Sequence, residues 1–284
     1  MGLMQSIALP AWTERFKAVT AKCHQCNRSV ALPHYSARKV GIKMHDNWYC
    51  SSRCFAAAAA DEFASLATSG LQRTKRFSRM PLGLLMVRYG LLNGAQFKEI
   101  RDEQKEEGAE IGELLVRLGS VSEKQVTAVR AIQWGCPVFS VPKWGMPAEI
   151  HIPSTLVRCY SMIPLHYVAT TNILLVGFVH GVDYGLLYAI EKITGCKTQA
   201  CFVTPSDFQS QVKFIEQVNT QSGEETPTEI KFESVQSSSE MARILCSYSV
   251  QLESDEAAIG RCKEYLWARV KCGPKAVDLL FKAA

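Results

Sequence analysis

The sequence predicts an α+β chain with three parts: a cysteine-rich module, a tandem helical-hairpin repeat packed with a small mixed α/β sheet domain, and a small C-terminal helix-plus-hairpin unit. Four cysteines are grouped near the N-terminus, a 24-residue motif occurs twice, and strand-like and helix-like segments alternate after it. Of the 284 residues, 47% are apolar and 21% are charged, as in ordinary globular proteins.

Composition also predicts where the chain divides. We expect a cysteine-rich region at 1–68, a linker at 69–80, the tandem motifs at 81–134, an α/β part at 135–217, a second linker at 218–229 and a C-terminal α+β unit at 230–284. Residues 1–80 carry a net charge of +8 and the remainder −3, which indicates modules with different partners, or solvated surface charge that also compensates thiolates.

No membrane span or secretory signal is expected. Apolar runs such as Ile173 to Val179 are far shorter than the roughly 20 residues that a bilayer helix needs. The first residues lack a basic start followed by an apolar core, so we expect a cytoplasmic protein. In that compartment disulfides are rare, and the seven scattered cysteines are interpreted as small buried hydrophobic residues.

The first element is a pair of cysteine pairs, Cys23-His-Gln-Cys26 and Cys50-Ser-Ser-Arg-Cys54, separated by 23 residues. Four thiolates on two tight turns can surround a tetrahedral Zn²⁺, so we predict a structural zinc site at Cys23, Cys26, Cys50 and Cys54. The alternative is a reduced segment without metal, and His24 or His45 could substitute as ligands. The pattern resembles zinc-ribbon or treble-clef knuckles, which serve nucleic-acid binding as well as protein docking.

The second element is the repeat. Residues 81–104 align with residues 110–133 at eight identical positions of 24. In each copy a short helix ends at a glycine, Gly90 or Gly119, and a polar residue then caps a second helix. Asn93 with Gln96, and Ser122 with Gln125, match the capping-box pattern.

Alternating elements follow. We expect strands at 137–142, 162–170, 172–179 and 196–203, and helices at 154–161, 183–194 and from Pro205 to 218. The C-terminal unit is predicted to contain a helix at 237–251 and a hairpin of strands 263–270 and 276–282.

The run from Leu82 to Gln133 resembles the tandem motif of type II secretion and type IV pilus assembly ATPases, the GspE N-terminal or MshEN domain, and the resemblance extends over about residues 78–217. It implies that each motif grips one guanine half of cyclic di-GMP. The residues implied as ligands are Leu82, Gly83, Met86, Val87, Arg88, Gln104, Ile111, Gly112, Leu115, Val116, Arg117 and Gln133.

The sequence departs from the family at the first position of each motif, where Pro81 and Glu110 replace the expected arginine. Losing these cations should weaken dinucleotide binding, because charge-assisted contacts are the strong ones. Arg79, or the repeated pairs Arg88/Arg117 and Arg101/Arg130, could compensate; alternatively, the repeated arginines are solvated helix faces.

No catalytic pattern is recognised. The string nearest to a phosphate-binding loop, from Ile193 to Thr198, lacks the Gly-Lys pair and fits a helix end better. We therefore expect a bacterial, non-enzymatic adaptor or regulator that docks to a secretion or pilus-type machinery or a signalling partner. The alternatives are a cyclic di-GMP receptor and a zinc-ribbon regulator that binds nucleic acid through the basic N-terminal region.

Overall fold

The structure is a computed structural model that describes residues 19–32, 41–69, 79–142, 150–221, 228–273 and 275–283. It confirms the predicted α+β class, with three sheets in the described part of the chain. Most of the predicted linker 69–80 lies outside the described residues, as do residues 222–227 of the second linker. No helix among the described residues is long and apolar enough to span a bilayer.

The two ends of the chain build one sheet. The N-terminal elements are β1 (Val19–Lys22), β2 (Ser29–Leu32), β3 (Ile42–Met44), β4 (Asn47–Tyr49) and α1 (Ser52–Ser69). The C-terminal elements are β8 (Thr228–Phe232), α9 (Ser238–Gln251), β9 (Glu256–Arg261), β10 (Tyr265–Cys272) and β11 (Lys275–Lys282). Strands from both sets form a six-stranded sheet in the order β4-β3-β9-β10-β11-β8, with β3 parallel to β9 and β8 parallel to β11.

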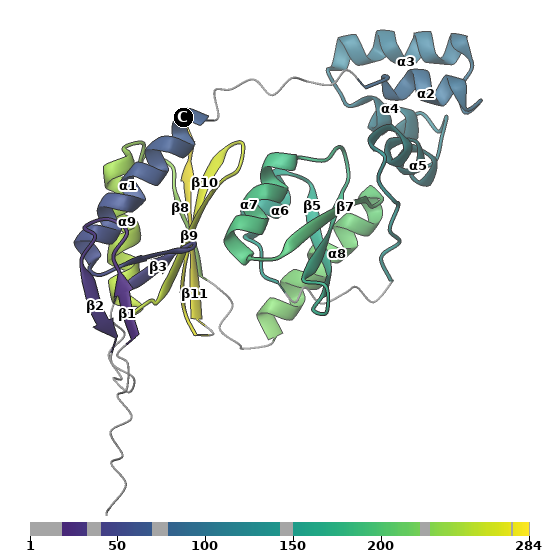
Figure 1. Ribbon diagram of the computed structural model, residues 1–284. Helices are drawn as coiled ribbons and strands as arrows, with labels where there is room; N and C mark the ends of the chain where they lie inside the picture. The colour runs from purple at the N-terminus through teal and green to yellow at the C-terminus, as the bar shows by residue number, and fades with distance from the viewer. Residues whose placement is uncertain are drawn as a thin grey trace, which may run out of the picture.

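This six-stranded sheet is covered on both faces. Helices α1 and α9 lie side by side on one face (Figure 1). Successive β10 residues accordingly belong to different cores. Leu266 and Ala268 pack under α1 and α9, whereas Trp267 lies on the other face of the sheet, in the core of the central α/β part. The sequence predicted separate N- and C-terminal units, and the structure joins them in one sheet.

The predicted C-terminal helix and hairpin are confirmed as α9, β10 and β11. The second linker is shorter than predicted, because α8 continues to Gln221 and β8 begins at Thr228. Phe232 of β8 stacks on Phe281 of β11 at 5.0 Å between ring centroids, and β8 pairs in parallel with β11.

The tandem helices form a small bundle with its own apolar core (Figure 1). They are α2 (Leu82–Arg88), α3 (Gly94–Glu107), α4 (Ile111–Arg117) and α5 (Glu123–Trp134). Both predicted capping boxes are confirmed, at Asn93 and at Ser122. Gly90 and Gly119 adopt φ of +69° and +68°, as a left-handed helix end requires.

The middle of the chain is a three-stranded sheet with helices. Its elements are α6 (Ser154–Cys159), β5 (Met162–Val168), β6 (Ile173–Phe178), α7 (Tyr184–Thr194), β7 (Lys197–Phe202) and α8 (Pro205–Gln221). The order is β5-β6-β7, with β5 and β6 antiparallel and β6 and β7 parallel, so β7 is an edge strand. The predicted strand at 137–142 is wrong: only Val138 forms a bridge, to Phe202, because Pro137 has no N–H with which to extend the ladder.

Helix α7 joins this part to the six-stranded sheet. A Cβ added at Gly260 of β9 would lie 3.2 Å from the Cβ of Ala189, so the absence of a side chain at 260 allows the helix to pack closely. Lys192 of α7 forms an ion pair with Glu62 of α1. The backbone N–H of Glu264 donates to the hydroxyl of Tyr160 at 3.0 Å. These contacts fix the two parts against each other.

Candidate functional site

The four predicted metal ligands come together at the start of α1. Cys23 and Cys26 lie on the turn between β1 and β2, where Asn27 adopts a φ of +57° and its N–H donates to the carbonyl of Cys23 at 2.9 Å. Cys50 follows β4, and Cys54 lies in the first turn of α1. Two tight backbone turns thus point the four thiols at one place.

The sulfur positions fit a tetrahedral metal. The four Sγ atoms all lie within 4.8 Å of one another, with 3.6 Å between Cys26 and Cys50 and 3.8 Å between Cys50 and Cys54. Zinc–sulfur bonds of ~2.3 Å at tetrahedral angles require sulfurs ~3.8 Å apart. A disulfide needs ~2.05 Å, and all eleven cysteines are free thiols. The cluster could therefore hold one metal ion; His24 and His45 are not members of it.

The protonation of these thiols depends on their crowding. Burial opposes ionisation of Cys23, but hydrogen bonds from backbone N–H groups, including that of Cys50 at 3.4 Å, outweigh it and lower its pKa to about 6. Hydrogen bonding with Cys26 raises the pKa of Cys50 to about 12. Four thiols this close do not ionise together without a cation, and a divalent metal would supply it.

The residues predicted to contact a dinucleotide fall into two groups. Leu82, Gly83, Met86, Gly112 and Leu115 are buried inside the helical bundle. Val87, Ile111 and Val116 are half-buried, whereas Arg88 and Arg117 are exposed, and Arg117 donates to Glu107 at 2.5 Å. The structure therefore uses the predicted aliphatic residues mainly for packing the four helices.

The two closing glutamines, half-buried, are engaged with backbone. Gln104, the last residue of the first motif, donates through Nε2 to the carbonyl of Ala109 at 3.3 Å. Gln133, the last residue of the second motif, donates to the carbonyl of Met80 at 2.7 Å. Each glutamine thus holds the residue that precedes the start of the other motif, and the repeat closes on itself.

Glu110 has a partner that the sequence did not reveal. Its carboxylate accepts from the backbone N–H groups of Gly112 (2.8 Å) and Glu113 (3.2 Å) at the start of α4. It also forms an ion pair with Arg130, whose side chain is 3% exposed and which donates to the carbonyl of Val179 at 2.9 Å. We call Glu110 and Arg130 the tandem lock, because they tie α4, α5 and the α/β part together.

The remaining arginines differ from one another. Arg130 is buried, so the interpretation of the repeated arginines as solvated holds for Arg88, Arg101 and Arg117 only. Arg79 lies over the ring of Trp134, 3.5 Å from its centroid. Pro81 precedes α2 with a φ of −55° and makes no side-chain cap.

The helix end predicted between Ile193 and Thr198, in the string nearest to a phosphate-binding loop, is confirmed. Gly195 ends α7 with a φ of +74°, and β7 begins at Lys197. The Thr198 side chain and N–H both donate to Glu191 at 2.8 Å. Asp183 caps the start of α7 by accepting from the N–H of Leu186, as expected for a helix start.

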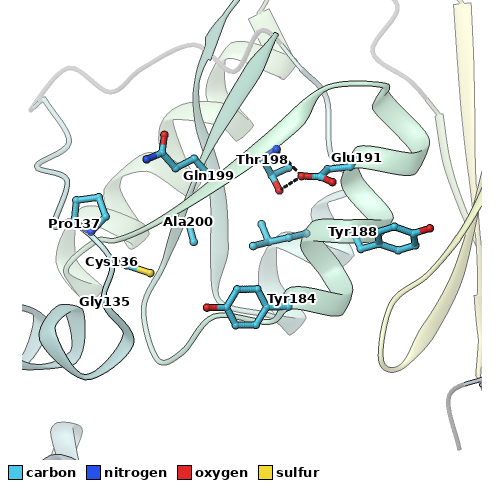
Figure 2. A pocket seen from close by; sticks show the side chains of 10 residues that line it. Gly135, Cys136, Pro137, Tyr184, Tyr188, Glu191, Thr198, Gln199 and Ala200 are labelled. Carbon is cyan, nitrogen blue, oxygen red and sulfur yellow. Dashed lines mark hydrogen bonds between the residues drawn. The ribbon is translucent and has the colours of Figure 1, made fainter. Parts of the chain in front are cut away.

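Sequence reasoning missed a hollow of about 430 Å³ between α7 and the edge of β7. In Figure 2 the ring of Tyr184 lies across it from Ala200, with Cys136 and Pro137 on the side opposite α7. Pro137, two residues after the helix-ending Gly135, was the available signal, because a proline there interrupts strand pairing.

No protein-family model matches the chain. The type IV pilus assembly ATPase PilB of Myxococcus xanthus is 26% identical over 87 residues, which are 30% of this chain and 15% of that protein. PilB of Thermus thermophilus is 22% identical over 129 residues, 45% of this chain and 14% of that protein. The match thus spans about one seventh of the length of these relatives.

Two solved structures are also similar. The structure of MshE with cdg is 20% identical and covers 49% of this chain and 99% of that chain, with a TM-score of 0.39. The N-terminal domain of XpsE is 16% identical and covers 47% and 92%, with a TM-score of 0.37. The sequence matches to the pilus ATPases confirm the predicted resemblance to this class of protein.

Proposed function

We propose that the chain is a non-catalytic cytoplasmic adaptor whose GspE-type domain docks to a secretion or pilus-type machinery. The proposal rests on the sequence similarity to pilus assembly ATPases together with one observation, the tandem lock. Where the resemblance implies an arginine available to a ligand, this chain carries a carboxylate already bound to an internal arginine.

The tandem lock favours a scaffold over a dinucleotide receptor. Glu110 satisfies the free N–H groups at the start of α4 with its own negative charge, so a phosphate there would meet a carboxylate. Gln104 and Gln133 already donate to backbone carbonyls. A dinucleotide would have to break these contacts before it could form its own.

The four-cysteine cluster would hold Zn²⁺ through Cys23, Cys26, Cys50 and Cys54. A bound zinc ion would cross-link the β1–β2 turn to the start of α1, and with four protein ligands it has no open position for water. Its role in the proposal is structural: it stabilises the part of the chain that completes the six-stranded sheet.

Affinity capture from the native host tests the proposal. The full chain is cross-linked in cells, purified and analysed by mass spectrometry, and we expect a component of a secretion or pilus-type apparatus to be recovered reproducibly. The purified chain should hydrolyse neither ATP nor GTP above background. Turnover that disappears in Lys197→Ala would contradict the non-catalytic assignment.

Two further measurements separate the alternatives. Calorimetry with cyclic di-GMP should give weak or no binding; tight binding that is lost in Arg88→Ala or Arg117→Ala would favour the receptor instead. Binding to DNA or RNA that weakens steeply with salt would favour the nucleic-acid regulator, since phosphate contacts release counterions.

A further inference from the structure

The hollow beside β7 borders a strand edge with free hydrogen-bonding capacity. Alternate residues of β7 face β6: the N–H of Lys197 donates to the carbonyl of Asn172 at 2.8 Å, and that of Val203 donates to Phe178 at 3.0 Å. The N–H and C=O groups of Thr198, Ala200 and Phe202 point away from β6, because successive residues of a strand alternate in direction.

Two of these outward residues are already engaged. The N–H of Thr198 donates to the Glu191 carboxylate, and that of Phe202 donates to the carbonyl of Pro137 at 2.8 Å. Ala200 lies between them and is in phase with both, so its N–H and C=O point toward the hollow.

The chain itself cannot continue the pairing to Ala200. The parallel register that sets Val138 opposite Phe202 would set Cys136 opposite Ala200, and the carbonyl of Ala200 would need the N–H of the residue after Cys136. That residue is Pro137, which has none. The N–H of Cys136 is committed to the end of α5, where it donates to Ala131 at 3.0 Å.

The walls of the hollow indicate what would fill it. Leu187 of α7 is a buried residue of its lining, and Tyr184, 58% exposed, faces Ala200 across it (Figure 2). Glu191 is the one charged residue among those that line it. Its carboxylate accepts from Thr198 through Oε1, which leaves Oε2 for another partner.

We propose that this hollow binds an extended, basic segment of a partner protein by strand addition. The segment pairs with the backbone of Ala200 in line with residues 137–139, places an apolar side chain against Tyr184 and Leu187, and directs a lysine or arginine to Glu191. Main-chain pairing combined with one side-chain pocket is a recognised mode of peptide capture. The inference deepens the proposed adaptor function and rests on it.

Selection from a phage-displayed library of linear eight-residue peptides tests whether the hollow binds such a segment. The library is panned on the full chain after depletion on Ala200→Pro, a variant that removes the outward N–H at an edge position where proline is tolerated. We expect enriched peptides with alternating apolar residues and a lysine or arginine. No enrichment over Ala200→Pro, or enrichment of acidic peptides, would overturn the proposal.

Synthetic versions of the enriched peptides provide the second arm, which does not depend on Ala200→Pro folding. In ¹⁵N NMR spectra the amide signal of Ala200 should shift on binding and become protected from exchange. Tyr184→Ser should weaken binding at least ten-fold, whereas Tyr89→Ser, also at an exposed tyrosine but outside the groove, should leave it unchanged. Equal effects of the two variants would contradict peptide binding in the hollow.

Glu191→Gln tests the charge, because glutamine still offers Thr198 an acceptor. The wild type should bind the basic peptide about two- to five-fold more tightly than its lysine-to-glutamine counterpart, and Glu191→Gln should bind both equally. Failure of these peptide experiments would overturn only the proposal that the hollow binds a peptide, whereas failure of the affinity capture from the host would overturn the proposed adaptor function.

Discussion

Arg130 is a buried cation whose charge is paired with one carboxylate, that of Glu110. Its side chain is 3% exposed and pairs with Glu110, which is 37% exposed. Removing one partner of a buried pair leaves the other charge uncompensated, at a cost of about 3–5 kcal/mol, and less where one partner is partly exposed. We therefore expect Glu110→Ala to lower the free energy of unfolding of the tandem helices by about 2–4 kcal/mol.

Hydrogen exchange over α4 and α5, combined with urea denaturation, measures this loss. Arg101→Met is the matched control, because Arg101 occupies the same repeat position as Arg130 but is exposed and should change stability by less than about 0.5 kcal/mol. Equal effects of the two variants would refute the tandem lock.

The cysteine cluster makes a prediction about metal content. Purified protein should carry about one zinc per chain, and Cys50→Ala combined with Cys54→Ala should lose it, because two ligands cannot hold the ion. Elemental analysis provides the measurement. Cys159→Ala removes an exposed thiol outside the cluster and should leave the zinc content unchanged.

Glu229 predicts a pH dependence. Burial would raise the pKa of this carboxyl, but hydrogen bonds from Thr155 and Ser154, with N–H and hydroxyl donors of Ser154 at 2.8 and 2.9 Å, outweigh it and lower the pKa. Because the folded pKa is depressed, the stabilisation is fully present above the ordinary value and is lost as pH falls through the lowered one.

We expect Glu229→Gln to melt below the wild type at pH 7, and this difference to shrink as the pH falls from about 4.5. Thermal melts followed by circular dichroism between pH 3 and pH 7 measure it. A melting-temperature difference that stays constant across this range would contradict the role given to the carboxylate.

The helices of the repeat are elements whose ends the sequence defines. Ser122 accepts from the N–H of Gln125 at 3.3 Å and caps α5, as Asn93 caps α3. Ser122→Ala should cost about 1 kcal/mol, and Ser122→Asp should restore most of it, because both serine and aspartate accept at this position. Urea denaturation compares the two variants; a Ser122→Asp variant as unstable as Ser122→Ala would contradict capping.

Local patterns account for the elements that the sequence predicted. Capping residues, helix-ending glycines and periodicity identified the tandem helices, α7, β5, β6 and the C-terminal hairpin. The partners of these elements could not be read in the same way. Nothing adjacent to Lys43 indicates that it lies opposite Glu256, and nothing near Glu110 indicates that Arg130 is its partner.

Burial was hardest to predict where a motif suggested a ligand. Met86 and Leu115 were implied as ligands of a dinucleotide, and both are fully buried in the helical core. An aliphatic residue at helical spacing serves packing and ligand binding with the same chemistry, so spacing alone does not distinguish them. The four cysteines come together as predicted, because thiol side chains, unlike aliphatic ones, have few other reasons to be grouped in the sequence.

The whole molecule depends on the shared six-stranded sheet. β3 pairs with β9 in this sheet, and α1 packs against α9 on one face of the sheet. We expect residues 228–284 alone to remain unfolded, because they would expose the core that α1 and β3 cover. Adding a fragment of residues 19–69 with Zn²⁺ should restore structure, measured by circular dichroism and by dispersion of NMR signals.

A fragment with Cys50→Ala and Cys54→Ala is the control for this complementation, since it should no longer support the sheet. Cooperative folding of residues 228–284 without any partner fragment would show that the sheet does not need its N-terminal strands.

This closure between distant segments sets the order in which the protein can form on the ribosome. β4 ends at Tyr49 and β9 begins at Glu256, so at ~5–20 residues per second about 10–40 s separate their emergence. The central part of the chain can fold in that interval, whereas β3 and α1 cannot pack until β9 and α9 have been synthesised. Incomplete synthesis would therefore leave the earliest residues exposed, and a nascent-chain quality-control system would encounter the N-terminal segment first.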